Sequence, residues 1–169
     1  MKQAGKIAAS AAALMIMAGS AFAADVPQVV VPVAPPPPPA PTFDWAGPYI
    51  GVYGGLVDGD VPDFGLQAGY NFLFGDRFFA GVEVGGGIFD FAVFAGALTA
   101  RAGAVLGDRL LVYVEAGVWT IGLTGFAPTV AGGAEFAVGD ALSLFGEAGW
   151  IFDCGCLIAK VGLNWHVGN

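Results

Sequence analysis

The chain of 169 residues carries 14 acidic and six basic side chains, for a net charge of −8, and 28 of its residues are glycine. Charged residues make up only 12% of the chain and hydrophobic residues 56%, whereas a soluble domain has about 25% charged residues. This composition argues against an ordinary soluble protein. The aromatic content of 13% argues against intrinsic disorder, and the excess of acids argues against nucleic-acid binding.

Residues 1–23 have the form of a secretory signal peptide. A short basic start with Lys2 and Lys6 precedes an apolar run over residues 7–17. Ala21 and Ala23 then place small side chains at the two positions that a signal peptidase reads. We expect cleavage after Ala23, which predicts a mature protein that works outside the cytoplasm.

Residues 24–43 are predicted to form a linker. Proline is concentrated there, with an unbroken run over residues 35–39. Such a run favours extended polyproline II and cannot pack a core. We expect a stiff spacer, on the periplasmic side of an outer membrane if the remainder of the chain spans one.

Residues 44–169 are predicted to form an all-β, eight-stranded antiparallel up-and-down transmembrane barrel. No stretch of about 20 apolar residues runs free of glycine clusters and charges, yet the segment is too hydrophobic for water. A barrel reconciles these facts because alternate residues face lipid and lumen. In the residues before 75, for example, Phe64, Leu66 and Phe72 share one face, while Gln67 and Asn71 share the other.

A repeat of 32 residues supports this fold. Asp44, Asp76, Asp108 and Asp140 are evenly spaced, and the last three follow a glycine. One period accommodates two strands of about 9–11 residues with a turn and a loop, so four units give eight strands. The strands are expected at 46–57, 64–74, 78–88, 95–106, 109–120, 128–138, 142–152 and 157–167. The Gly-Asp dipeptides predict short periplasmic turns, and longer external loops are expected at 58–63, 89–94, 121–127 and 153–156. Part of each loop could instead extend a strand.

Three runs of residues are distinctive, and each lies within or at the start of a predicted strand. They are Trp45-Ala46-Gly47-Pro48-Tyr49-Ile50-Gly51, Gln67-Ala68-Gly69-Tyr70-Asn71-Phe72 and Val161-Gly162-Leu163-Asn164-Trp165. They resemble the opening, second and last strands of small outer-membrane proteins of alphaproteobacteria, the porin-family surface-antigen type. The resemblance implies an eight-stranded barrel similar to the OmpA membrane domain, inserted by the barrel-assembly machinery into the outer membrane of a Gram-negative bacterium. It also implies a structural component that is not an enzyme.

Six charged residues are predicted to face the lumen at similar depth. By parity these are Glu83, Arg101, Glu115, Glu135, Glu147 and Lys160. Hairpin counting places Glu83 and Glu115 opposite Arg101, Lys160 diagonal to Glu147, and Glu115 beside Glu135. Ions in a narrow lumen must be paired because desolvation costs several kcal/mol per ion. We expect a polar plug that supports envelope integrity. A narrow porin-like channel is the alternative.

Two further constellations are weaker. Ser143 and His166 face inward near Asp140, so a lipid-modifying hydrolase is conceivable, although no nucleophile-elbow motif surrounds the serine. Cys154 and Cys156 could form a disulfide or pair between molecules, and they offer too few ligands for a metal. No cofactor is predicted. The apolar loops could contact lipid, lipopolysaccharide, a membrane-protein partner or a second copy of the chain.

Overall fold

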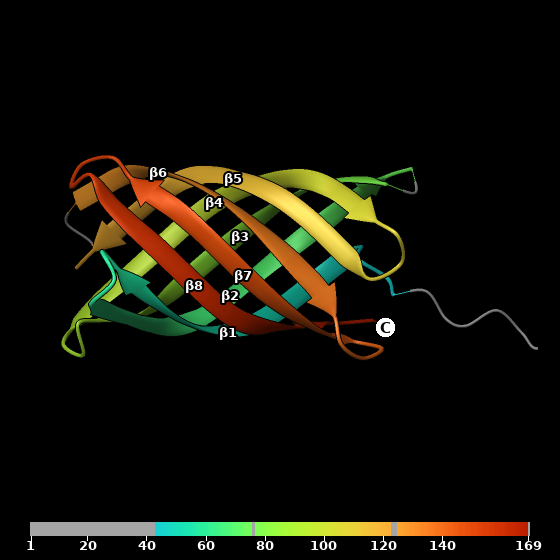
Figure 1. Cartoon of the computed structure of the whole chain (residues 1–169), viewed down its shortest axis with the longest axis horizontal. Helices are drawn as coiled ribbons and strands as arrows, with labels where there is room; N and C mark the ends of the chain where they lie inside the picture. Colours follow the sequence, from blue (N-terminus) through green and yellow to red (C-terminus); the bar gives the residue numbers. More distant parts are fainter. Residues whose placement is uncertain (1–42, 76, 123–124, 169) are drawn as a thin grey trace, which may run out of the picture. The chain divides into compact units, whose positions relative to one another are not determined.

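The computed structural model describes residues 43–75, 77–122 and 125–168. The predicted signal peptide and residues 24–42 of the predicted linker lie outside the described residues. Eight strands form, with bounds β1 Gly47–Val57, β2 Val61–Phe74, β3 Phe78–Phe89, β4 Val93–Leu106, β5 Leu110–Ile121, β6 Gly125–Ala137, β7 Leu142–Ile151 and β8 Cys156–His166. Each strand pairs antiparallel with its neighbours in sequence, and β1 pairs with β8 to close the barrel (Figure 1). The predicted all-β, eight-stranded antiparallel barrel is therefore confirmed.

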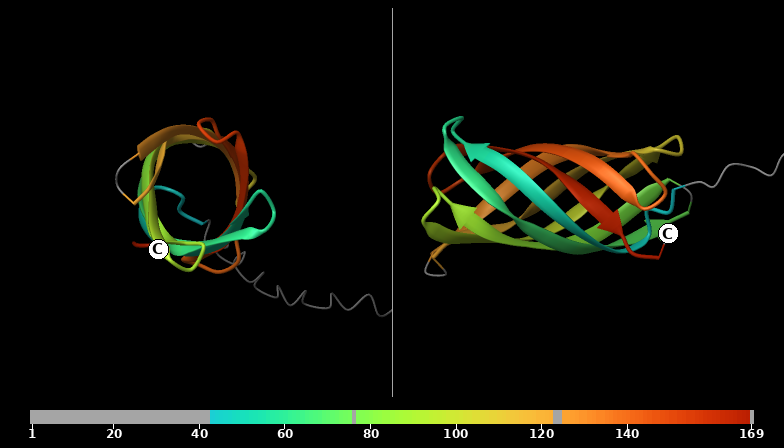
Figure 2. Two further views of the ribbon diagram at one scale, coloured as in Figure 1. Left: turned by 90° about the vertical axis from the view of Figure 1, so that its left-hand side faces the viewer. Right: turned by 90° about the horizontal axis from the view of Figure 1, so that it is seen from below.

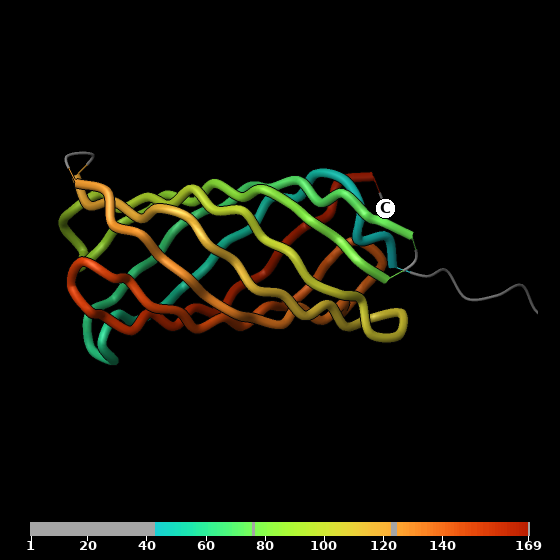
Figure 3. Tube along the Cα trace, turned by 90° about the horizontal axis from the view of Figure 1, so that it is seen from above, coloured from blue at the N-terminus to red at the C-terminus, as the bar shows by residue number. Residues whose placement is uncertain are grey.

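Viewed along its axis, the barrel is a closed ring (Figure 2). The start of β1 and the end of β8 lie at the same end of the barrel (Figure 3), which we call the terminal end. The opposite end, which we call the loop end, carries the connections 58–60, 90–92, 122–124 and 152–155. Within the described residues, no helix is long and apolar enough to cross a membrane.

The predicted difference in length between the two sets of connections is wrong. β2, β4 and β6 begin at Val61, Val93 and Gly125, which is two to three residues earlier than predicted. The cross-strand register continues into the predicted loops, so Val57 pairs with Val61 and Phe89 with Val93. Part of each loop extends a strand, and connections at both ends are three or four residues long. Connection length therefore does not distinguish the two ends.

The predicted Gly-Asp turns differ among themselves. Gly75 and Gly107 have φ angles of +65° and +66°, a left-handed conformation that glycine adopts without steric cost. The third dipeptide lies in a turn of another form, in which the amides of Val138 and Gly139 both donate to the carbonyl of Leu142. The 32-residue period therefore preserves the position of the turns more strictly than their conformation.

Candidate functional site

The barrel lumen has a polar centre between two apolar layers. The terminal layer, at the terminal end, consists of buried residues Trp45, Phe79, Val105, Leu111, Tyr113 and Ala137, with Phe43 and Leu73 packed against them. The loop layer, at the loop end, consists of Val57, Ala95, Trp119, Ala127, Ile151 and Ile158, with Val61 and Phe89 among the residues packed against it. The predicted charged residues lie on the lumen face between these layers, and all are buried except Lys160, which is half-buried.

Arg101 is the hub of the polar centre. Its Nη1 lies 3.3 Å from Glu83 Oε2, and its Nη2 lies 3.1 Å from Glu135 Oε2. Its Nε donates to Asn71 Oδ1 at 3.2 Å. The rings of Tyr49 and Tyr113 lie 4.7 Å and 4.8 Å from the guanidinium carbon, at which distance an aromatic face attracts a cation. A single guanidinium thus joins strands from several sides of the barrel.

Glu135 accepts contacts on both carboxylate oxygens. Oε2 faces Arg101, while Oε1 accepts from Ser143 Oγ at 2.5 Å and from Asn164 Nδ2 at 2.9 Å. His166 Nε2 lies 3.0 Å from the same Oε1. Glu135 and Ser143 are fully buried. Charge-assisted hydrogen bonds of this kind are roughly twice as strong as neutral ones, so the cluster ties β6, β7 and β8 together inside the lumen.

A second ion pair lies nearer the loop end. Lys160 Nζ is 2.8 Å from Glu147 Oε1, and Tyr113 donates from its hydroxyl to Glu147 Oε2 at 3.1 Å. Lys160 also lies 5.4 Å from the centroid of the Tyr53 ring. Tyr113 contacts both Glu147 and Arg101, so it links the two ion-pair clusters into one network.

The predicted pairings are only partly right in register. Arg101 lies directly opposite Glu115, but its ion pairs run to Glu83 and Glu135. Glu115 instead accepts from the Thr99 hydroxyl at 3.4 Å. Glu83 lies opposite Thr99 rather than Arg101, because the β3–β4 connection is centred one residue earlier than predicted. The long Arg101 side chain still reaches Glu83 diagonally.

Two other predicted relations also change. Lys160 lies directly opposite Glu147 rather than diagonal to it. Glu135 lies opposite Leu111, two lumen-facing positions from Glu115 along β5, so the two glutamates are not the neighbours that hairpin counting gave. Glu135 is paired with Arg101, whereas Glu115 forms no ion pair with any residue in the described part of the chain.

The arrangement around Ser143 and His166 is unsuited to hydrolysis. Ser143 Oγ lies 3.2 Å from His166 Nε2, but the carboxylate that contacts this pair is Glu135 rather than Asp140. Both Ser143 and Glu135 face the same Nε2, while the buried Nδ1 has no hydrogen-bond partner among the described residues. A serine relay needs the base at one ring nitrogen and the orienting carboxylate at the other. The rings of Phe43 and Trp45 also pack on His166, at centroid distances of 4.9 Å and 5.4 Å.

Three lumen tyrosines were missed by the sequence reasoning, although a signal for them exists. Tyr49, Tyr53 and Tyr113 each lie directly opposite a glycine, at Gly69, Gly65 and Gly133 respectively. A Cβ atom on any of these glycines would collide with the tyrosine ring. Alternation along each strand places these tyrosines on the lumen face, and the directly opposite residue on the paired strand is a glycine. These two signals together would have identified the rings as lumen residues.

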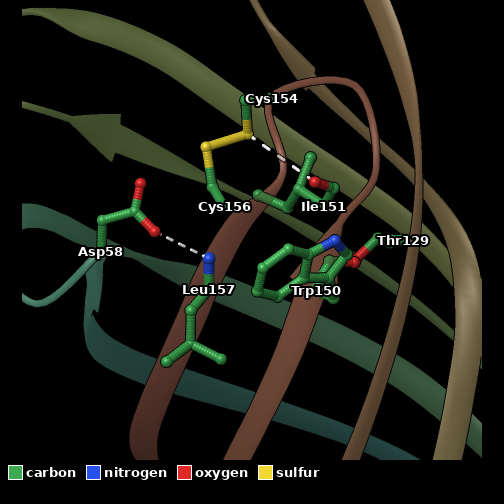
Figure 4. Close-up of a disulfide and its surroundings, with 7 residues drawn as sticks. All are labelled: Asp58, Thr129, Trp150, Ile151, Cys154, Cys156 and Leu157. Atoms are coloured by element: carbon green, nitrogen blue, oxygen red, sulfur yellow. Dashed lines mark hydrogen bonds between the residues drawn. A yellow bond between two sulfur atoms is a disulfide. The ribbon is translucent and has the colours of Figure 1, made fainter.

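The two cysteines form a disulfide between the β7–β8 connection and the first residue of β8. Cys154 and Cys156 are joined two residues apart (Figure 4). The amide of Leu157 donates to the Asp58 carboxylate at 2.8 Å, which ties this connection to the one between β1 and β2. In the described part of the chain, no group of three or more His, Cys, Asp or Glu side chains is placed to hold a metal ion.

Solved transmembrane β-barrels share this fold. A de novo designed transmembrane barrel matches with a TM-score of 0.58 and 19% identity, over 73% of this chain and 98% of the designed one. Ail, the attachment invasion locus protein of Yersinia pestis, matches with a TM-score of 0.54 and 10% identity, over 70% of this chain and 94% of its own. The N-terminal barrel domain of Pseudomonas aeruginosa OprF matches with a TM-score of 0.50 and 16% identity, over 71% of this chain and 96% of that domain.

At these low sequence identities, the structural matches show a likeness of fold alone. No protein-family model matches the chain, and no curated protein matches it. The resemblance to alphaproteobacterial proteins therefore stays a prediction from the sequence.

Proposed function

We propose that this protein is a structural component of the outer membrane of a Gram-negative bacterium, with a lumen that does not conduct ions. The observation that carries the proposal is the filling of the lumen, in which a network of ion pairs lies between two apolar layers. An eight-stranded barrel has an interior just wide enough for side chains to fill. A barrel filled in this way supports itself in a bilayer and leaves no aqueous path.

The outer wall supports the membrane placement. Large apolar side chains cover it, and Leu66, Val114 and Val161 are each 65% or 66% exposed on the isolated barrel. Exposing apolar surface to water costs roughly 25 cal/mol per Å², so a wall of this kind needs a lipid environment. The strands, 10 to 14 residues long, match the about 9–11 residues that a tilted strand needs to cross a bilayer.

The partners in this proposal are those of a membrane scaffold. Outer-membrane lipid and lipopolysaccharide surround the wall, and the barrel-assembly machinery inserts it. The proline-rich linker lies in the periplasm as a tether. A membrane-protein partner or a second copy of the chain could pack on the wall. We propose no catalytic role, because the inward serine and histidine lack the geometry of a relay.

Planar-bilayer recording on the refolded protein tests the sealed lumen. Heat-modifiable mobility on gels first establishes that the barrel has folded. Folded protein is expected to give no reproducible conductance steps, because the central side chains leave no continuous water path. Steady steps that scale with salt concentration would contradict the proposal.

Those steps would favour a second candidate function, a narrow cation channel. Among the residues that the structure describes, five carboxylates face the lumen and two bases oppose them. The acids are Asp63, Glu83, Glu115, Glu135 and Glu147, and the bases are Arg101 and Lys160. This excess of negative charge would attract cations and repel anions. A reversal potential under a salt gradient would report that selectivity directly.

A further inference from the structure

The loop end of the barrel contains a cavity that has no part in the proposed structural role. Its volume is about 360 Å³, at the lower end of the range of about 300–1,000 Å³ for small-molecule pockets. We call it the mouth cavity. Phe89, Trp119, Ala127 and Ile151 line its wall, and Asp153 with the disulfide of Cys154 and Cys156 forms part of its rim.

The wall of the mouth cavity is apolar and carries aromatic rings. Phe89 and Trp119 meet edge to face, with their centroids 5.6 Å apart. Ala127 and Ile151 are buried beside them. Such a surface favours an apolar body, and the face of a tryptophan or phenylalanine ring also attracts an organic cation.

The rim of the mouth cavity carries one sign of charge. Within the described residues, the charged side chains exposed at the loop end are all acidic, namely Asp58, Asp60, Asp90 and Asp153. The exposed bases, Arg77 and Arg109, lie in connections at the terminal end. The rim therefore has a negative potential, and no exposed base among the described residues lies at this end to offset it.

A further carboxylate adds to this potential from below. Asp63 pairs in register with Phe89 of the cavity wall. It is only 1% exposed, and its Oδ1 has no hydrogen-bond partner. A buried carboxylate close to a small apolar cavity, together with the aspartates exposed at this end, favours a cationic occupant and disfavours an anionic one.

We propose that the mouth cavity binds small organic cations that join an apolar, ring-sized body to an amine. The body packs against Trp119 and Phe89, and the ammonium group stays at the wet rim beside Asp153. The combination of an apolar wall and an acidic rim selects this chemistry over a fatty acid or another anionic amphiphile. The site does not depend on whether the lumen conducts.

Three probes of nearly equal size test this proposal: 2-phenylethylamine, 2-phenylethanol and 3-phenylpropionate. Each is titrated at neutral pH into the full protein folded in a neutral detergent, and binding is followed by tryptophan fluorescence and ligand-observed NMR. The amine is expected to bind about three-fold more tightly than the alcohol and about ten-fold more tightly than the carboxylate, where ten-fold corresponds to about 1.4 kcal/mol. Equal affinity for all three, or absence of binding by the amine, would overturn the proposal.

Two variants locate the binding. Ala127→Leu places three more carbons in the cavity and is expected to abolish binding of the amine. Asp153 is exposed, so Asp153→Asn should not disturb folding. This variant is expected to weaken binding of the amine about three-fold and to leave binding of the alcohol unchanged. Asp108→Asn at the terminal end is the matched control and should change neither. Amine binding that survives both Ala127→Leu and Asp153→Asn in folded protein would contradict the assignment.

Discussion

At the scale of the residue, Arg101 determines how charge is held inside this barrel. It is 2% exposed and contacts Glu83, Glu135 and Asn71. A buried ion pair contributes little net stability compared with a well-packed apolar substitute, but the loss of one partner leaves an uncompensated charge. Arg101 therefore matters chiefly because two carboxylates depend on it.

Replacing Arg101 by methionine is expected to destabilise the barrel by about 3–5 kcal/mol, because Glu83 and Glu135 lose their base. Denaturant unfolding of the protein in lipid vesicles measures this change. Arg109→Gln, at an exposed turn position, is the control and should have little effect. Combining Arg101→Met with Glu83→Gln and Glu135→Gln should recover part of the loss. A single variant as stable as the wild type would show that the network does not support the fold.

At the scale of the strand pair, bulky rings in the lumen lie directly opposite glycines of the neighbouring strand. Besides the three tyrosines, Phe145 lies opposite Gly162, where a Cβ atom would collide with its ring. These pairs occur between β1 and β2, β5 and β6, and β7 and β8. The glycine gives each ring room to lie across the neighbouring strand, so the narrow lumen can be filled without spreading the strands apart.

Gly69→Ala is expected to destabilise the barrel by about 1–3 kcal/mol, the usual cost of overpacking, because the new methyl group would displace Tyr49 from Glu83 and Arg101. Denaturant unfolding in vesicles again gives the free energy. Gly146→Ala is a matched control on the outer wall, since a Cβ atom there would meet nothing within 4 Å. Equal effects of the two substitutions would indicate that backbone freedom, rather than ring packing, explains the glycines.

Much of this element-level architecture could be predicted from sequence, and the errors have physical causes. Strict alternation identifies the two faces, because one face must be apolar and the other small or polar. The start of β2 was predicted too late, because the alternation continues back through Asp63 to Val61. An error of one residue in the centre of a hairpin shifts the opposite partner by two, which moved Glu83 from Arg101 to Thr99. Diagonal reach of long side chains cannot be read from such counting.

At the scale of the whole molecule, buried side chains occupy the lumen at three levels along its axis. The terminal layer contains Trp45, which precedes β1 and is only 2% exposed. Its carbonyl accepts a hydrogen bond from Asn71 Nδ2 at 3.1 Å. The loop layer contains Trp119, and the network around Arg101 lies between the two. The three levels lie at different heights along the same strands, so removing one tryptophan side chain from each apolar layer leaves the ion pairs of Arg101 in place.

The double variant Trp45→Ala and Trp119→Ala is therefore expected to remain non-conducting. Both apolar layers lose their largest side chain, yet Arg101 with its carboxylates and tyrosines still fills the centre. Planar-bilayer recording on protein with heat-modifiable mobility measures the outcome, and each single variant provides a control for folding. Adding Arg101→Ala to the double variant should open a path lined by an excess of carboxylates, with steps that select cations. Conductance in the double variant alone would mean that the apolar layers, and not the ion-pair network, seal the barrel.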